Sequence, residues 1–325
     1  MRKVQGRSSH RRQRRSVRAG RTLVVLTAYG VLTWYAVDSH GAPNRSLTKT
    51  HSIGPTTTQV HQRPTPAQEQ PGWMAVTRNH GAIVADRRTF VQRDGNVITV
   101  FRFRAGQVRF ALHAGSEDPP GLATAVGPGG GPQISPTESK VIVAAFNGGF
   151  KVASGSGGFE LGVRVFVPLQ VGRASFVIDS SGAAQVGVWG KDVPYRGEHV
   201  VSVRQNLQPL VMDGKLSPLI DDIGAWGSPL GGAAVVARSA VGQDARGNIL
   251  YAAGMSALPL DLGAALIDAG AVRAMELDIN PEWVQLASTP HPGGNLVAGI
   301  PNQNRPGDQY SIGWTRDFVT VTERQ

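Results

Sequence analysis

The chain contains no cysteine among its 325 residues. This absence excludes disulfide bonds, cysteine-ligated metal sites and a thiol nucleophile. A domain without such cross-links must be held together by a hydrophobic core, and the chain is long enough to form a sizeable one.

Several catalytic signatures are absent as well. The sequence has no Walker loop, no H-E-x-x-H and no G-x-S-x-G, and it has no cysteine–histidine cluster. Four of the eight histidines precede residue 62, and the others have no distinctive neighbours. A nucleophilic triad built on histidine is therefore poorly supported.

Charge is nearly balanced outside the N-terminus. The net charge is +10, but nine cations and no acid precede residue 22. Without these nine, 24 Lys and Arg stand against 23 Asp and Glu. The basic character is thus a feature of one short segment, and we expect no nucleic-acid partner for the rest of the chain.

An uncharged apolar run at 22–37 follows the basic residues 1–21. This order is typical of an export or anchoring signal, because cations resist translocation and stay in the cytoplasm. As a helix the run spans about 24 Å, less than the roughly 30 Å hydrocarbon layer. Trp34 and Tyr35 suit the outer interface, and no clear A-x-A cleavage site follows.

We therefore expect an uncleaved single-span membrane anchor at 22–37, with 1–21 as a basic cytoplasmic tail. A cleaved signal and a soluble cytoplasmic protein are the alternatives. An anchor places the rest of the chain outside the cytoplasm at the cell membrane, and a cleaved signal makes it secreted.

Residues 38–72 are rich in Pro, Thr, Gln and His and lack apolar periodicity, which predicts a disordered linker. From residue 73 to residue 325 the composition is typical of a globular domain. Many glycines and short β-branched runs predict an α+β fold, a strand-rich single domain with a mixed β-sheet core and a few helices.

Individual elements can be placed by pattern. Strands are expected at 97–103, 108–112, 141–146, 200–203, 233–237, 248–252 and 272–279, with 108–112 paired to 97–103 and a hairpin formed by 174–179 and 185–189. A capping box at 135–138 opens a short helix. A longer helix is expected at 259–269, ended by Gly270, and 121–132 reads as a Gly/Pro loop.

One candidate site segment is Asn147-Gly148-Gly149, which follows an apolar strand. Glycines let backbone N–H groups approach a ligand, and the asparagine amide offers both a donor and an acceptor. An ordinary turn at a strand end is the alternative interpretation.

A second candidate is the carboxylate pair Glu276 and Asp278. Alternate residues of a strand share a face, so the two carboxylates would lie roughly 6.5–7 Å apart, a separation of the order found in glycosidases. The pair suits acid/base chemistry, and with Glu282 it offers oxygen ligands for a divalent cation. A solvated face or structural salt bridges are the alternative. Trp283 could supply a flat wall for a sugar, or belong to the core.

Two arginines follow apolar runs, Arg204 and Arg238. Arginine binds phosphate or carboxylate through paired N–H groups. For each of them taken alone, a surface salt bridge is the simpler interpretation.

Four short segments are informative through their order along the chain: AFNGGF at 145–150, QPLVMDG at 208–214, RSAVG at 238–242 and ELD at 276–278. Together they resemble the phosphodiester glycosidase family, relatives of the enzyme that uncovers mannose 6-phosphate by removing N-acetylglucosamine from a phosphodiester. The corresponding family motifs are N-G-G-F-F, P-x-L-V-x-x-G, R-T-A-I-G and the start of N-L-D-G-G-G-S. Residues 259–270 resemble the helix before the last motif.

The resemblance implies an extracytoplasmic hydrolase that cleaves sugar-1-phosphodiester bonds in phosphate-linked glycans of the cell envelope. It implies that Asp278 is the catalytic carboxylate beside Glu276, that Arg238 rather than Arg204 clamps the anion, and that Asn147 positions the substrate. The implied substrate-binding set is Gly148, Gly149, Arg204, Asp213, Asn280, Glu282 and Trp283.

The chain departs from the family after Asp278, where Ile279-Asn280-Pro281-Glu282 replaces the usual glycines. Proline has no N–H and a fixed φ, so a loop of glycine backbone donors cannot form there. This departure favours the alternative function, a non-catalytic glycan- or envelope-binding module on the same fold.

Overall fold

The computed structural model describes residues 70–92, 94–120, 130–195, 197–227 and 232–325. The predicted anchor, nearly all of the predicted linker and most of the Gly/Pro loop lie outside these residues. Within the described ranges, no helix is long and apolar enough to cross a membrane.

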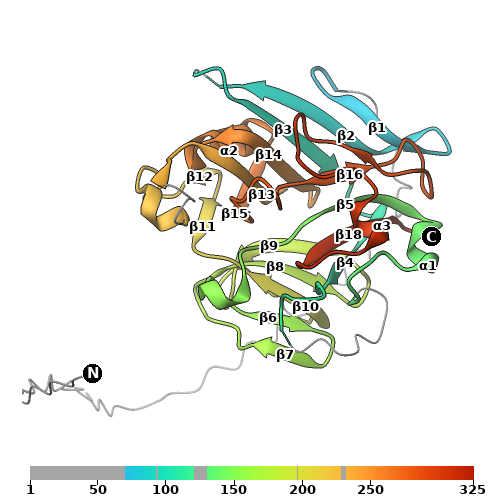
Figure 1. The fold of residues 1–325 in the computed structure, drawn as a ribbon, viewed down its shortest axis with the longest axis horizontal. Helices are drawn as coiled ribbons and strands as arrows, with labels where there is room; N and C mark the ends of the chain where they lie inside the picture. The colour runs from blue at the N-terminus through green and yellow to red at the C-terminus, as the bar shows by residue number, and fades with distance from the viewer. Residues whose placement is uncertain (1–69, 93, 121–129, 196, 228–231) are drawn as a thin grey trace, which may run out of the picture. The chain divides into compact units, whose positions relative to one another are not determined.

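Three β-sheets make up the described part of the chain (Figure 1). The first sheet has eight strands in the order β1-β2-β3-β14-β13-β15-β11-β12. In chain order these are β1 (Met74–Asn79), β2 (Ala82–Val91), β3 (Val97–Phe103), β11 (Pro209–Met212), β12 (Lys215–Leu216), β13 (Val236–Asp244), β14 (Ile249–Ala257) and β15 (Ala271–Glu276).

The second and third sheets have five strands each, in the orders β7-β6-β10-β8-β9 and β17-β16-β5-β18-β4. The second contains β6 (Phe159–Leu161), β7 (Arg164–Val167), β8 (Ala174–Asp179), β9 (Ala184–Val188) and β10 (Val200–Gln205). The third contains β4 (Val108–His113), β5 (Ile142–Asn147), β16 (Leu286–Ser288), β17 (Val297–Ala298) and β18 (Phe318–Glu323). The α-helices are α1 (Pro136–Ser139), α2 (Pro259–Asp268) and α3 (Gln309–Ile312), with 3₁₀ turns at Val152–Ser154 and Ile223–Trp226.

The central strands of the first sheet are buried on both faces. One face packs on α2, where Leu250 and Ala252 join Leu262 in one apolar cluster. The other face meets the second and third sheets, and here Ile249 and Tyr251 belong to the main core. Because side chains alternate along a strand, β14 contributes to both clusters, and its sequence is almost continuously apolar.

The predicted strand-rich α+β class is confirmed. The strand at 97–103, the hairpin of β8 and β9, and the capping box of α1 all form as expected. Helix α2 covers 259–268 and is followed by Gly270 at φ +100°, a left-handed conformation that favours glycine at a helix end.

Two expectations about the sheets were wrong. Strand β4 pairs with β18 in the third sheet and not with β3. Every pairing between named strands is antiparallel in the described ranges, so the core is not a mixed sheet. The step from β14 through α2 to β15 does connect two strands of the same direction, but β13 lies between them and pairs antiparallel with both.

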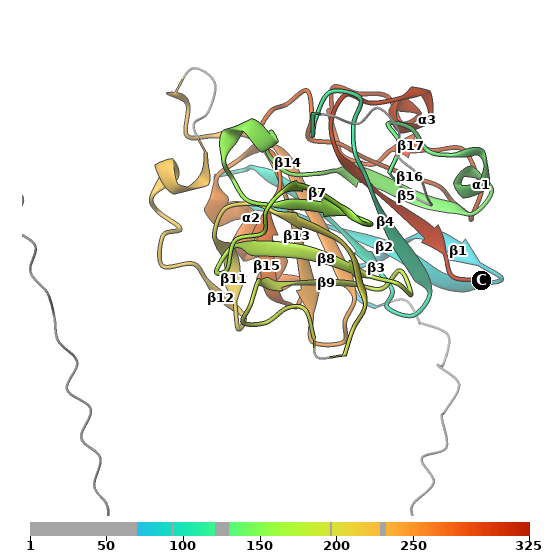
Figure 2. The same ribbon diagram turned by 90° about the horizontal axis from the view of Figure 1, so that it is seen from below.

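Strand ends from all three sheets meet in one region, which Figures 1 and 2 show from two sides. Strand β5 ends at Asn147 opposite Phe318, the first residue of β18. Strand β15 ends at Glu276, three residues earlier than expected, and the chain beyond it stays hydrogen-bonded to Ser239 of β13. The residues that follow these ends form the candidate site.

Candidate functional site

Asn147 lies at the centre of the region and is buried, with 2% of its surface exposed. Its amide nitrogen donates to Ser239 Oγ at 2.9 Å and to the Gly148 carbonyl at 2.8 Å. Its amide oxygen accepts from the Tyr251 hydroxyl at 2.7 Å. With donors and acceptors both satisfied inside the protein, Asn147 is a positioning residue that fixes Ser239.

Ser239 connects Asn147 to Asp278. Its hydroxyl oxygen accepts from the Asp278 N–H at 3.2 Å, and its own N–H donates to the Asp278 carbonyl at 2.9 Å. These bonds extend the β13–β15 pairing beyond the last residue of β15. The backbone of Asp278 is therefore held in place by a central strand of the first sheet.

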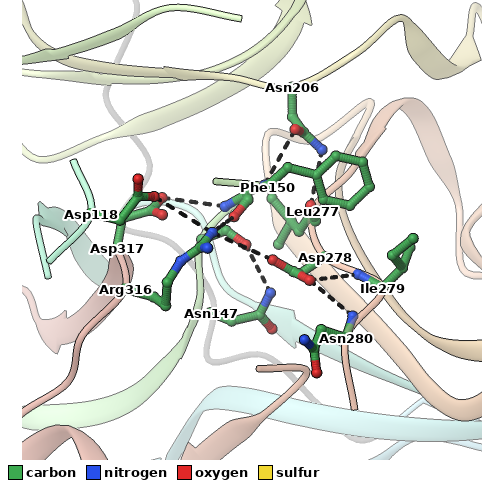
Figure 3. A network of polar contacts seen from close by, with 12 residues as sticks. Asp118, Asn147, Phe150, Asn206, Leu277, Asp278, Ile279, Asn280, Arg316 and Asp317 are labelled. Atoms are coloured by element: carbon green, nitrogen blue, oxygen red, sulfur yellow. Dashed lines mark hydrogen bonds and ion pairs between the residues drawn. The ribbon is translucent and has the colours of Figure 1, made fainter. Parts of the chain in front are cut away.

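The Asp278 carboxylate turns away from the strand (Figure 3). Its Oδ1 accepts from the N–H groups of Ile279 at 2.7 Å and Asn280 at 2.9 Å, and its Oδ2 lies 3.7 Å from Arg316 Nη2. Burial raises the pKa of Asp278 to about 7, although Arg316 and the two N–H groups oppose the shift. A carboxyl group with this pKa exchanges protons near neutral pH.

Arg316 crosses the site from the segment before β18. Its Nη2 donates to the Gly149 carbonyl at 2.9 Å and lies 3.6 Å from Asp118 Oδ2. Its guanidinium carbon lies 4.2 Å from the centre of the Trp283 ring, which also lies 5.0 Å from Lys151 Nζ. Arg316 Nε and Nη1 are buried and have no hydrogen-bond partner within the protein. Burial raises the pKa of Asp118, and Arg316 opposes that shift.

A second ion pair supports the glycine segment. Arg204 Nε donates to Asp317 Oδ2 at 2.8 Å, and both side chains are buried. The Gly148 N–H donates to the Asp317 carbonyl at 2.9 Å, and the Gly149 N–H donates to Asp317 Oδ2 at 3.2 Å. The expectation that these glycine N–H groups face a ligand was therefore wrong, because Asp317 occupies them.

Asn206 connects the end of β15 to the segment that follows β5. Its amide nitrogen donates to the carbonyls of Glu276 at 2.8 Å and Leu277 at 2.9 Å. Its amide oxygen accepts from the Phe150 N–H at 3.4 Å. The end of β15 and the segment after β5 are thus held at a fixed separation by one buried side chain.

The structure places Arg238 and Glu276 away from Asp278. Arg238 Nη1 donates to Glu276 Oε1 at 2.7 Å, and both side chains have no exposed surface. Further Arg238 nitrogens donate to the carbonyls of Ala234 and Ala257. Neither Arg238 nor Glu276 faces solvent, so the predicted anion clamp and the predicted carboxylate pair on one face are not formed.

The separation has a simple cause. Met275 and Leu277 point into the main core, so Glu276 faces the α2 side as alternation requires. Asp278 no longer follows this alternation, because β15 has ended and the carboxylate binds the N–H groups of the next turn. Burial raises the pKa of Glu276, and Arg238 opposes this shift.

Two further predicted residues lie apart from the site. Asp213 is exposed in the turn between β11 and β12, beside Val272, at the end of β15 opposite to Asp278. Glu282 is also exposed, and it pairs with Arg305 at 2.7 Å. A substrate-binding role for Asp213 in this site is contradicted by its position.

Asn280 and Trp283 do border the site. Asn280 donates its N–H to Asp278, and its side-chain oxygen accepts from the Glu282 N–H at 2.9 Å. Trp283 is half-buried against Arg316. The loop without glycines therefore supplies two backbone donors to Asp278 and one aromatic ring.

The cation site suggested for Glu276, Asp278 and Glu282 is not assembled, since the three carboxylates contact three different arginines. Across the described ranges, no group of three or more His, Asp or Glu side chains is placed to hold a metal ion.

Sequence reasoning missed the residues that surround Asp278, namely Asp118, Asn206, Ser239, Arg316 and Asp317. The strongest available signal was the pair Arg316-Asp317, two opposite charges directly before an apolar strand. Ser239 lies inside the RSAVG segment, but only the arginine of that segment attracted a prediction.

No protein-family model matches the chain, and no curated protein matches it. Among solved structures, one similar to this chain is the catalytic domain of zebrafish N-acetylglucosamine-1-phosphodiester alpha-N-acetylglucosaminidase auto-inhibited by its pro-peptide. The identity is 16% and the TM-score 0.48, over 78% of this chain and 88% of that one. A hypothetical protein from Synechocystis is similar at 13% identity and TM-score 0.46, over 75% of this chain and 63% of that one. Membership of the phosphodiester glycosidase family stays a prediction.

Proposed function

We propose that this protein is a hydrolase that cleaves the bond between a sugar C1 and a phosphodiester, with Asp278 as its acid/base residue. The observation that carries the proposal is the Asp278 carboxyl group, whose pKa is raised to about 7 beside the Arg316 guanidinium. A proton-transfer group is most effective when its pKa lies near the working pH. The four motifs that resemble the phosphodiester glycosidase family support the choice of substrate.

In the proposed reaction a water molecule attacks the sugar C1. The Asp278 carboxylate takes one proton from this water, whose oxygen forms the new bond to C1. The C1–O bond breaks, and its electron pair leaves with the phosphate as a phosphomonoester. The proton then passes from Asp278 to the phosphomonoester or to solvent, so the products are a free sugar and a phosphomonoester.

The surrounding residues hold Asp278 ready for this role. Asn147 fixes Ser239, and Ser239 fixes the Asp278 backbone. The N–H groups of Ile279 and Asn280 hold Oδ1, which leaves Oδ2 as the proton-transferring oxygen on the side of Arg316. Each contact fixes the carboxyl group before substrate arrives, which is how positioning lowers a barrier.

The test uses the full chain with a panel of sugar-1-phosphodiesters, with and without a chelator. We expect the release of free sugar and phosphomonoester, and a loss of about 10²–10⁴-fold in kcat for Asp278→Asn. Asp213→Asn is the matched control, because Asp213 is exposed in a distant turn and asparagine tolerates its positive φ of 49°. Full hydrolysis by Asp278→Asn would rule out the proposed role.

A second candidate is a non-catalytic module that binds a glycan of the cell envelope. One observation favours it: Asp278 has only 3% of its surface exposed, and Asn147 has 2%. A cavity of about 890 Å³ lies elsewhere, between β4, α1 and the β6–β7 turn, and Asp278 does not line it. Retention of glycan without release of product would favour the binding module over the hydrolase.

We also propose that the protein acts outside the cytoplasm and is attached to the cell membrane by 22–37, or is secreted if this segment is cleaved. The basic residues 1–21 followed by the uncharged run support this. Its partner would be a phosphate-linked glycan or another envelope polymer. Protease protection of intact cells tests the topology: the domain should be degraded from outside and residues 1–21 protected.

A further inference from the structure

The Arg316 guanidinium has donors that the protein does not use. All of its polar contacts described above are made by Nη2, which faces the Gly149 carbonyl, Asp118 and Asp278. Nε and Nη1 are buried without an acceptor, and only 4% of the residue surface is exposed. Leaving buried N–H groups of a cation unpaired is unfavourable, so an arginine in this state suits an acceptor that arrives from outside.

The nearby carboxylates leave the Arg316 charge incompletely compensated. Asp317 is the adjacent residue, but its Oδ2 accepts from Arg204. Asp118 and Asp278 lie 3.6 and 3.7 Å from Nη2, longer than the 2.7–2.9 Å of a charge-assisted hydrogen bond. Burial raises the pKa of both, which lowers the negative charge that would oppose a second anion.

Trp283 and Lys151 define where that anion enters. The Trp283 ring lies against the guanidinium, and the exposed Lys151 ammonium lies near the same ring. The exposed Lys151 ammonium is therefore the cation that an anion approaching along the Trp283 ring meets before the buried Arg316 guanidinium. Stacking on the ring also restricts the plane in which Arg316 can present its donors.

We infer that Arg316 is the anion-binding residue of this site, and that a phosphodiester oxygen accepts from its unpaired Nη1. The inference deepens the proposed function and rests on it for the identity of the anion. It replaces Arg238, which is sealed inside the fold, by an arginine whose free donors lie beside Asp278. With the phosphate held there, the C1–O bond would lie near the Asp278 carboxylate.

The experiment measures binding without turnover. Dimethyl phosphate is titrated into the full chain by calorimetry, since this anion has no sugar C1 and cannot be hydrolysed by the proposed reaction. Trimethyl phosphate, which has a similar shape but no charge, is the ligand control. We expect the anion to bind and the neutral ester not to bind.

Arg316→Gln should weaken dimethyl phosphate binding at least tenfold, and Arg316→Lys should weaken it less because the charge remains. Arg305→Gln is the matched control, since Arg305 also lies on a tryptophan ring, that of Trp314, but is only half-buried and is paired with Glu282. It should bind like the parent protein. Circular dichroism checks that each variant is folded. If Arg316→Gln does not fold, Arg316→Lys provides the test.

The outcomes separate this inference from the proposed function. Binding that depends on Arg316 in a protein that cleaves no sugar-1-phosphodiester would keep the anion site and remove the hydrolase. Hydrolysis with an unchanged KM and unchanged dimethyl phosphate binding in the Arg316 variants would keep the hydrolase and remove the anion site. Failure of the parent protein to bind dimethyl phosphate would also overturn the anion site.

Discussion

Arg238 and Glu276 form an ion pair of 2.7 Å with no exposed surface, on the side of the first sheet that α2 covers. Arg238 also donates to the carbonyls of Trp226, Ala234 and Ala257. One guanidinium thus connects β13, the end of β14 and the chain on either side of 228–231. Its position assigns it a structural role.

The first prediction concerns this pair. Arg238→Met leaves the Glu276 carboxylate and three carbonyls without a donor, so it should lower the free energy of unfolding by about 3–5 kcal/mol. Glu276→Leu should cost a similar amount, because it leaves the arginine charge unpaired. The double variant should cost less than the sum of the two, as measured by urea unfolding in a double-mutant cycle.

A further variant of the pair, Glu276→Gln, distinguishes structure from catalysis. If Glu276 acts only through stability, the folded fraction of Glu276→Gln should hydrolyse substrate with a nearly unchanged kcat. Glutamine keeps an acceptor for Arg238 Nη1 and removes only the charge. A large fall in kcat at unchanged stability would show that Glu276 takes part in catalysis.

The second prediction concerns pH and stability. The pKa of Asp278 is about 7 in the folded protein against an ordinary 3.8, so the folded state keeps a proton that the unfolded chain releases within this window. The free energy of unfolding should therefore fall as pH rises from about 4 to about 7, by up to about 4 kcal/mol from this group. Below pH 4 its contribution is fully present.

Chemical denaturation at a series of pH values measures the effect as the difference between the parent and Asp278→Asn. Asparagine cannot titrate but still accepts from the N–H groups that hold Oδ1. The variant should show a flatter pH dependence, and Asp213→Asn should show the parental slope. Identical slopes for all three proteins would contradict the raised pKa.

Local patterns predicted the elements better than the site. Helix α2 could be found because its proline start and glycine end are local signals. Asn147 and Asp278 could be found because each is a polar residue after an apolar strand. The place of Arg316 in the site could not be predicted, since its contact with Gly149 joins residues 167 positions apart, and such a contact depends on how the three sheets stack.

Arg238 shows a different limit. An arginine after an apolar run can face solvent or the interior, and sequence alone does not say which face of a strand is covered. Here both faces of the first sheet are covered, and the partner that neutralises Arg238 is the very glutamate that was predicted to act with Asp278. Arg238 and Glu276 were therefore both correctly singled out from the sequence, but they were wrongly grouped with Asp278.

The third prediction tests the packing behind the glycine segment. A methyl group at Gly148 would overlap Asp317 Oδ2, so Gly148→Ala must displace the Arg204–Asp317 ion pair. We expect a loss of about 1–3 kcal/mol or more in the free energy of unfolding. Gly131→Ala is the control, because a methyl group there meets no atom within 4 Å and should change stability by less than about 0.5 kcal/mol.

The fourth prediction concerns pH and turnover. As the general base, Asp278 must be ionised, so kcat/KM for a sugar-1-phosphodiester should rise with pH and level off above a midpoint near 7, the pKa of Asp278 in the free protein. A phosphodiester anion bound at Arg316 adds negative charge near this carboxyl group and disfavours its ionisation. The midpoint of the kcat profile should therefore lie at a higher pH than that of kcat/KM.

Initial rates from pH 5 to 9 at saturating and limiting substrate separate the two midpoints. A phosphodiester keeps one negative charge over this range, so the profile reports the protein and not the substrate. Arg305→Gln should keep both midpoints. Arg316→Lys should shift the kcat/KM midpoint upward, because a less well-placed cation stabilises the Asp278 carboxylate less. A kcat that stays constant across the range would show that no group with a pKa near 7 takes part in the rate-limiting step, and Asp278 would lose its role as the base.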